Sequence, residues 1–324
     1  MKLERFLSGL TKLKRGSTPY GLAPHKPILL LTLLDLLERG YIHDNRFFID
    51  DILVSTFHEN WDLLAADGFV EDFTLPFYHL QNDKIDSAAF WFLQTIPGFQ
   101  ITKHIRSIQT LSEVVEYACF SDAIFQMLTH KENRDAMRRV LVNTYFPASA
   151  MHYFRADREQ GKYLKEVQQY VLNEVPKVMR LQVAEEEMVY VRNLTFKKMV
   201  PKVYQSTCAI SGMKVSSING KSLIDACHIV PFSNTQDDRV TNGIALCPNL
   251  HRAFDTELVS INQDFRVLVS QQVVEEVSHP YGLAILRGKK IILPEEKHLW
   301  PSQENLDWHR NEKNKYKNAV FQSV

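Results

Sequence analysis

The chain has 324 residues, of which 45% are hydrophobic and 23% charged, so two domains with substantial cores are expected. The 38 basic residues balance the 38 acidic ones, which argues against a wholly basic coat protein for nucleic acid but allows basic residues to cluster on one face. The four cysteines form no C-x-x-C pair, which argues against a disulfide framework. The longest apolar run, residues 28–34, is too short to cross a bilayer, which argues against a membrane partner and favours a soluble, cytoplasmic protein.

The first half of the chain predicts mostly helices. Apolar residues recur at helical spacing in several segments, and Gly16 and Gly40 end two of them. The helical segments are residues 1–15, 28–37, 49–64, 111–125 and 134–145. Residues 75–80 and 88–93 resemble a hairpin that presents aromatic side chains. Residues 1–155 are therefore expected to form a mainly helical domain with a small sheet.

Residues 156–204 are expected to connect two domains. A charged helix is expected over residues 157–173, and Pro176 interrupts it. Residues 192–204 carry Lys197, Lys198 and Lys202. Such a basic helix could lie on phosphates or form an ordinary solvated surface.

Residues 205–324 are expected to form a second domain. A β-branched segment over residues 222–229 predicts a strand, which Pro231 ends. Asn242-Gly243 is typical of a turn, and residues 244–247 predict either a second strand or the approach to a helix. Pro248 is well placed to begin a helix over residues 249–258. Further strands are expected over 265–272 and 284–293, with a closing helix over 304–316.

Three side chains within this second domain suit metal-assisted hydrolysis of a phosphodiester. His228 lies on the first strand, and a neutral histidine has a pKa near working pH and can take a proton from water. His251 and Asp255 are four residues apart on one helix face, so their ligating atoms can meet at one ion. A divalent ion can neutralise charge on a scissile phosphate.

The order His228, Asn242, His251 resembles the HNH, or ββα-metal, nucleases. The phrases Asp-Ala-Cys-His-Ile-Val-Pro and Asn-Gly-Ile-Ala-Leu-Cys-Pro-Asn-Leu-His-Arg-Ala-Phe-Asp are similar to the branch found in restriction-type endonucleases. The resemblance implies that His228 is the general base, that Asn242 braces the loop, and that His251 is a metal ligand. It also implies a divalent cofactor, with Mg²⁺ or Mn²⁺ expected and Zn²⁺ or Ni²⁺ as alternatives.

Cys227 departs from the family pattern. Many HNH enzymes carry an acidic residue or a second histidine ligand immediately before the base, where this chain has a cysteine. Asp255 would complete the metal shell, and Asp225 is a second candidate. The other interpretation of the cysteines is that they are small buried hydrophobic residues.

The N-terminal half carries another resemblance. Residues 23–31, 76–81 with Phe90-Trp91, and 145–152 are similar to the sulfur-recognising domain fused to HNH nucleases in phosphorothioate-dependent restriction enzymes. That resemblance implies backbone contacts from a basic pair and an apolar dimple for sulfur. The implied DNA-binding residues are His25, Lys26, Phe146, Pro147 and Ala150.

The chain departs from this second pattern in two places, and each segment has a plainer interpretation. Lys26 stands where arginine is common, and Phe146 where tyrosine is common. Residues 25–27 could simply begin a helix, and Phe146-Pro147 could end one against the core. Sulfur is larger and more weakly hydrated than oxygen, so an apolar cavity beside a cation could still select it.

The expected protein is therefore an α+β, two-domain DNA endonuclease: a mainly helical DNA-reading domain followed by a ββα-metal nuclease domain. Its partner would be double-stranded DNA, phosphorothioate-modified in the sharper hypothesis, and it would serve in restriction of foreign DNA. One site cuts one strand, so a double-strand break would need a homodimer or two visits. The alternatives are a nuclease toxin or defence effector with a protein-interaction domain, and a binding-only reader whose HNH domain is degenerate at Cys227.

Overall fold

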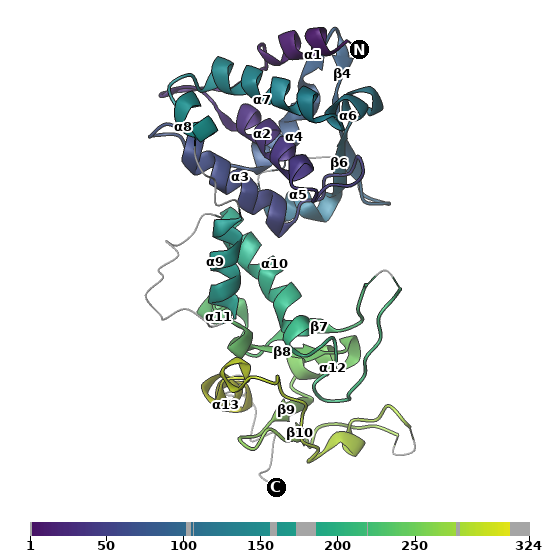
Figure 1. Cartoon of the computed structure of the whole chain (residues 1–324). Helices are drawn as coiled ribbons and strands as arrows, with labels where there is room; N and C mark the ends of the chain where they lie inside the picture. The colour runs from purple at the N-terminus through teal and green to yellow at the C-terminus, as the bar shows by residue number, and fades with distance from the viewer. Residues whose placement is uncertain are drawn as a thin grey trace. The chain divides into compact units, whose positions relative to one another are not determined.

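The computed structural model describes residues 2–101, 105, 107–155, 161–172, 186–218, 220–276 and 279–311. The chain divides into two compact units, residues 1–165 with 182–191 and residues 166–181 with 192–324. Figure 1 shows a helix-rich N-terminal unit and a C-terminal unit of short strands and helices, which confirms the α+β prediction. The expected domain boundaries at 155 and 204 stay a prediction. Within the described ranges, no helix is both long enough and apolar enough to span a membrane.

The N-terminal unit is built around α2 (His25–Glu38), whose residues from Pro27 to Leu36 are all buried. A helix that is apolar on every face must be covered on every face. Helices α3, α4 and α7 provide that cover, and α7 also packs against α1 (Figure 1). The surrounding helices are α1 (Leu3–Leu10), α3 (Asp51–Leu64), α4 (Thr74–His79), α5 (Ile108–Val114), α6 (Asp122–Leu128), α7 (Lys131–Tyr145) and α8 (Ala150–Arg155).

The described residues of this unit also form three small antiparallel sheets. Strand β5 (Trp91–Thr95) pairs with β6 (Val115–Phe120), and two short hairpins are formed by β1 (Ser17–Thr18) with β2 (Gly21–Leu22) and by β3 (Lys84–Ile85) with β4 (Ala88–Ala89). The buried Trp91 ring lies against Phe77 and Phe120, and its indole N–H donates to the Phe77 carbonyl at 3.0 Å. The sheet is thereby fastened to α4.

Two predictions for this unit were wrong. Residues 75–80 do not form a strand, because Phe73 and Phe77 lie one helical turn apart and pack together in the core at 5.3 Å between ring centroids. Residues 111–125 do not form one helix, because β6 interrupts them to pair with β5. In the second segment the deciding partner, β5, is distant in sequence, so tertiary packing overrides local periodicity.

Helices α9 (Lys162–Val171) and α10 (Glu186–Val203) carry residues of both units, and α10 includes Pro201 in its last turn. In the C-terminal unit, β7 (Asp225–His228) pairs antiparallel with β8 (Gly243–Leu246), and His228 lies opposite Gly243. Helix α12 (Pro248–Asp255) begins with proline, as the sequence predicts, and it packs on both strands. This hairpin and helix form the ββα core.

The rest of the C-terminal unit supports α12. Strands β9 (Val259–Ile261) and β10 (Val267–Val269) pair, and α13 (Gln303–Asn311) packs on β9. His309 of α13 is buried, stacks on Phe254 of α12, and bonds Ser260 Oγ at 2.8 Å and the Phe254 carbonyl at 3.0 Å. The C-terminal end of α12 is thus fixed from outside the ββα core.

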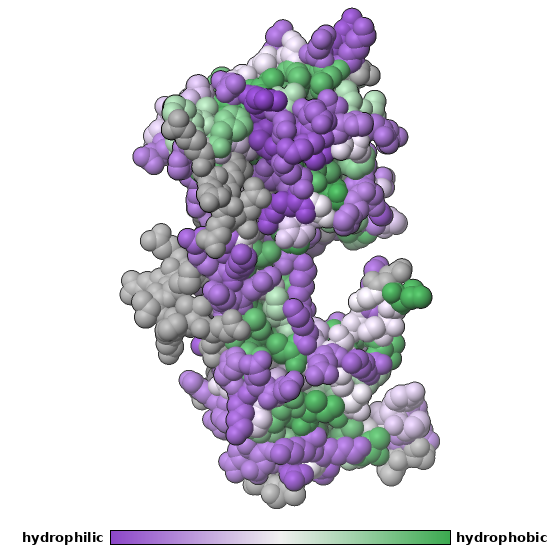
Figure 2. All heavy atoms as spheres, viewed as in Figure 1, coloured by the Kyte–Doolittle hydropathy of each residue, from purple (hydrophilic) through white to green (hydrophobic). Residues whose placement is uncertain are grey.

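The expected strand over residues 284–293 was wrong. That segment begins with the short 3-10 helix η3 (Ala284–Leu286), and Lys290 makes a single bridge to Arg266. Gly288 takes a left-handed φ of 71°, which turns the chain between the two. The closing helix is observed to residue 311, and its expected continuation to 316 lies outside the described residues. Hydrophilic residues cover most of the visible surface of each unit (Figure 2).

Candidate active site

The alternation of side chains along β7 directs neighbouring residues to opposite faces of the hairpin. Asp225 and Cys227 point toward α12: the Cys227 Sγ lies 3.8 Å from Asp255 Oδ1, and Asp225 Oδ2 lies 3.5 Å from His251 Nδ1. His228 points the other way and stacks on Phe196 of α10. The strand therefore supplies ligand atoms on one face and the candidate base at its last position.

Three side chains form a donor cluster that could hold a metal ion. The Cys227 sulfur, a His251 ring nitrogen and an Asp255 carboxylate oxygen all lie within 4.8 Å of one another. His251 Nε2 is 3.5 Å from Asp255 Oδ2 across one helical turn, the spacing from which the sequence predicted a shared ion. Cys227 is buried, whereas half of the Asp255 side chain is exposed. Thiolate, imidazole and carboxylate are all ligands of divalent metals, and an exposed flank leaves room for a substrate oxygen.

His228 is held most closely by Phe196 and Asp238, and the ring of Phe232 lies further off, with 6.3 Å between centroids. The His228 ring lies parallel to that of Phe196, with 3.9 Å between centroids and 10° between planes. Its Nε2 lies 3.1 Å from Oδ1 of Asp238, a carboxylate that is fully buried. The other oxygen of Asp238 has no hydrogen-bond partner among the described residues. The imidazole side chain keeps 18% of its surface exposed, so solvent reaches it.

Asn242 is fully buried and fastens the loop that follows β7. Its Oδ1 accepts the backbone N–H of Val230 at 2.9 Å, and its Nδ2 donates to the carbonyl of the same residue at 3.0 Å. Its own carbonyl accepts the N–H of Ile229 at 2.9 Å. The same Nδ2 also donates to the Asp237 carbonyl at 3.0 Å, so loss of the amide would leave three backbone groups near His228 without this partner.

Gly243 allows α10 to approach β8 closely. A Cβ at this position would stand 2.6 Å from Val200 Cγ2 and 2.8 Å from Phe196 Cε2, closer than van der Waals contact permits. Its backbone φ of −126° is ordinary, so space and not backbone conformation calls for glycine here. The absence of a side chain at this residue is what lets Phe196 lie over the ring of His228.

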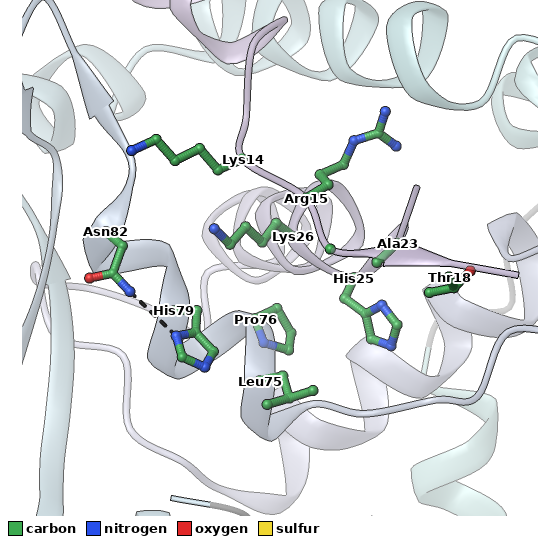
Figure 3. Close-up of a pocket in the computed structure, with 11 residues that line it drawn as sticks. Lys14, Arg15, Thr18, Ala23, His25, Lys26, Leu75, Pro76, His79 and Asn82 are labelled. Atoms are coloured by element: carbon green, nitrogen blue, oxygen red, sulfur yellow. Dashed lines mark hydrogen bonds between the residues drawn. The ribbon is translucent and has the colours of Figure 1, made fainter. Parts of the chain in front are cut away.

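The N-terminal unit contains a pocket of about 520 Å³. Figure 3 shows the long side chains of Lys14, Arg15 and Lys26 on one side and those of Leu75 and Pro76 from α4 on the other. The remaining lining residues are Gly16, Thr18, Ala23, His25, His79 and Asn82. The pocket therefore combines cations with an apolar wall.

The two basic residues expected to contact DNA both have partners inside the protein. His25 Nε2 lies 2.9 Å from the Val70 carbonyl, and burial of its ring lowers the His25 pKa, which favours the neutral form. The Lys26 ammonium is paired with the buried carboxylate of Asp83. By contrast, Lys14 and Arg15 form no ion pair with any described residue, and the Arg15 guanidinium lies over the Tyr145 ring.

The three residues expected to form a sulfur dimple lie apart from the lining of this pocket. Phe146 follows α7 and is buried, Pro147 is exposed, and Ala150 begins α8 half-buried. None of them lines the pocket that includes His25 and Lys26. The structure thus joins two of the five expected DNA-binding residues in one pocket.

Residues 208–262 match the HNH endonuclease family. The matched segment contains β7, β8, α12 and the donor cluster described above. The C-terminal unit therefore contains an HNH endonuclease domain, and domains of this family hydrolyse phosphodiester bonds.

The solved structures that are similar to this chain include two restriction endonucleases. One is titled "Modification dependent TagI restriction endonuclease"; it is 20% identical, with a TM-score of 0.31, over 40% of this chain and 40% of that chain. The match thus spans less than half of the TagI enzyme. The other, the "Type IV phosphorothioation-dependent restriction endonuclease ScoMcrA", is 11% identical, with a TM-score of 0.31, over 76% of this chain and 94% of that chain. No curated protein matches the chain.

Sequence reasoning missed several residues of these sites. At the active site, Phe196 and Asp238 flank His228. In the N-terminal pocket, the cations Lys14 and Arg15 form no ion pair with any described residue. Asp238 lies in the loop between His228 and Asn242, so a carboxylate in that interval was an available signal. Phe196 belongs to α10, before the matched segment, and its contact with His228 carries no local signature.

Proposed function

We propose that this chain is a restriction-type DNA endonuclease whose HNH domain cuts DNA with a divalent metal ion, and whose N-terminal unit selects phosphorothioate-modified DNA. The observation that carries the nuclease part is the convergence of Cys227, His251 and Asp255 on one side of β7, with His228 as the next residue of the strand. Metal ligands beside a histidine are the groups that phosphodiester hydrolysis needs.

The chain's own residues divide the chemistry between them. His228 takes the proton of the attacking water, since a neutral imidazole accepts a proton near neutral pH. Cys227, His251 and Asp255 would hold the ion, and Asp225 lies close enough to His251 to orient its ring. A divalent ion bound there would stabilise negative charge on the phosphate and the leaving oxygen. Asn242 keeps the loop after β7 in place while this happens.

The metal is proposed to be divalent, with Mg²⁺ or Mn²⁺ as the expected ions. The thiolate of Cys227 adds a soft donor, which raises affinity for Zn²⁺ and Ni²⁺ relative to a shell of oxygen and nitrogen alone. Activity should therefore be compared across all four ions.

Selection of DNA is assigned to the cationic pocket of the N-terminal unit. Lys14 and Arg15 supply charge that no described carboxylate neutralises, and phosphate contacts dominate affinity for DNA. The wall of Leu75 and Pro76 is apolar. Sulfur is weakly hydrated, so it loses less hydration free energy than oxygen when it contacts such a wall. The segment of Phe146, Pro147 and Ala150 is the second candidate for the sulfur contact, on the strength of its sequence.

The test is a plasmid digest with the full-length protein. Modified and unmodified forms of one supercoiled plasmid are incubated with Mg²⁺, Mn²⁺, Zn²⁺ or Ni²⁺, with a chelator as the blank. Metal-dependent cutting of the modified plasmid alone is the expected result. Equal cutting of both plasmids would indicate a nuclease that does not select sulfur, such as a toxin or a defence effector. Binding without cutting in any metal would indicate a reader with a degenerate HNH domain.

A further inference from the structure

We infer that Asp238 is a positioning residue that holds His228 in the tautomer whose Nδ1 accepts the proton. The inference rests on the proposed function, because it assigns an orienting partner to the proposed base. It concerns a carboxylate in the loop between β7 and β8, outside the metal-donor cluster.

The contacts with Phe196 and Asp238 restrict different motions of the imidazole. The parallel stack on Phe196 fixes the plane of the ring at 10° to the phenyl plane. Stacking depends little on which ring atoms carry nitrogen, so it leaves the choice of tautomer and the direction of each nitrogen open. The 3.1 Å contact between His228 Nε2 and Asp238 Oδ1 makes that choice.

The direction of this hydrogen bond follows from the chemistry of its acceptor. An ionised carboxylate can only accept, so Nε2 must carry the hydrogen. In a neutral imidazole, Nδ1 then keeps the lone pair. No described residue forms a hydrogen bond with Nδ1, and the exposed fraction of the side chain lets water reach the ring. A buried carboxylate also stabilises the imidazolium that forms once the proton is taken.

The surroundings of Asp238 are not those of a structural carboxylate. It is fully buried, and its Oδ2 has no partner among the described residues. Burying a carboxylate oxygen without a partner is costly, so a neutral residue would satisfy a purely structural role better. The adjacent Asp237 differs, since both of its oxygens are bonded by the Arg239 side chain, at 2.8 and 2.7 Å.

That difference provides a matched pair of variants in the full-length protein. Asp238→Asn keeps the shape of the side chain but can donate to Nε2, which favours the opposite tautomer. We expect the single-turnover rate of plasmid nicking to fall by about 10²- to 10⁴-fold, the range of a general base and its orienting partner. The affinities for DNA and for Mn²⁺ should stay unchanged. Asp237→Asn, the control, should change the nicking rate by less than about 3-fold, since its carboxylate pairs with the partly exposed Arg239 and not with His228.

A double-mutant cycle separates positioning from a structural role. If Asp238 acts only through His228, Asp238→Asn should have no further effect on the residual nicking rate of His228→Ala. A further fall of the same size in that background would overturn the inference. If His228→Ala itself nicks normally, the proposed base is wrong; if His228→Ala is inactive while Asp238→Asn is fully active, only the present inference fails.

The wild-type protein gives a test that does not depend on the Asp238 variants. Nitrogen NMR of histidine-labelled protein, with the His228 signals assigned by their loss in His228→Ala, reports the tautomer directly. The expected spectrum shows a protonated Nε2 and an unprotonated Nδ1 for His228. The opposite tautomer in the wild-type protein would overturn the inference whatever the variants do.

Discussion

The thiol of Cys227 lies 3.8 Å from Oδ1 of Asp255, although 28 positions separate the two residues in the sequence. The contact joins the first strand of the ββα core to the last turn of its helix. It places the residue that departs from the common HNH pattern inside the donor cluster, where a second ligand is usually found. Cys227 is therefore a candidate ligand.

The first prediction concerns the metal. Loss of an outer-shell partner alone typically costs about 10- to 100-fold in metal affinity, so His251→Ala and Asp255→Ala should each cost at least that. Cys227→Ser should weaken Zn²⁺ more than Mn²⁺, because it replaces a soft donor with a hard one. Calorimetric titration of each ion measures this, with Cys119→Ser as the control thiol in the other unit. Unchanged Zn²⁺ affinity in Cys227→Ser would show that the Cys227 sulfur is not a metal ligand.

The second prediction concerns the free cations of the N-terminal pocket. Lys14→Ala and Arg15→Ala should weaken DNA binding and should each lower the slope of log affinity against log salt by about 1. Binding is measured by gel shift over a salt series in the non-cutting His228→Ala background. Lys131→Ala is the matched control, because Lys131 is an exposed lysine of the same unit that is paired with carboxylates. An equal loss of DNA affinity in Lys131→Ala would mean that binding depends on the net charge of the unit and not on the pocket.

The third prediction concerns sulfur. Burying an oxygen without a partner costs roughly 1–3 kcal/mol in proteins, so a duplex with one phosphorothioate should bind about 5- to 150-fold more tightly than its phosphate counterpart. Leu75→Asp should erase the preference if the α4 wall contacts the sulfur, whereas Ala150→Asp should erase it if the segment after α7 does. A competition assay between matched duplexes of one stereochemistry decides between them. Equal wild-type affinity for both duplexes would end the sulfur hypothesis.

The fourth prediction concerns Gly243. A methyl group there must displace Phe196 or Val200, so Gly243→Ala should lower the free energy of unfolding by roughly 1–3 kcal/mol. Because Phe196 fixes the ring plane of His228, the nicking rate should fall as well, while metal affinity is kept. Urea unfolding and single-turnover nicking measure the two effects. A stable variant with the wild-type nicking rate would show that the stack contributes nothing to catalysis.

Local sequence was sufficient for the ββα core. The β-branched run before Pro231, the proline that begins α12, and the spacing of His251 and Asp255 are short-range signals, and β7, β8 and α12 appear where those signals predict them. Alternation along a strand and the helical repeat are properties of the backbone itself, so they can be read without a partner. The leucine-rich run likewise predicted the buried α2.

Most of the errors and omissions depend on partners outside the segment concerned. Strand β6 forms where a helix was predicted, because it pairs with β5. Helix α4 forms where a strand was predicted, because Phe73 and Phe77 pack in a core that the periodicity alone does not define. The cluster of Cys227 with Asp255, the pairing of Lys26 with Asp83 and the contact of His228 with Asp238 exist only once the chain is folded. The sequence by itself determined which residue types could perform the chemistry. Only the tertiary structure decided which of them meet, because side-chain distance and burial are set by packing between segments far apart in the chain.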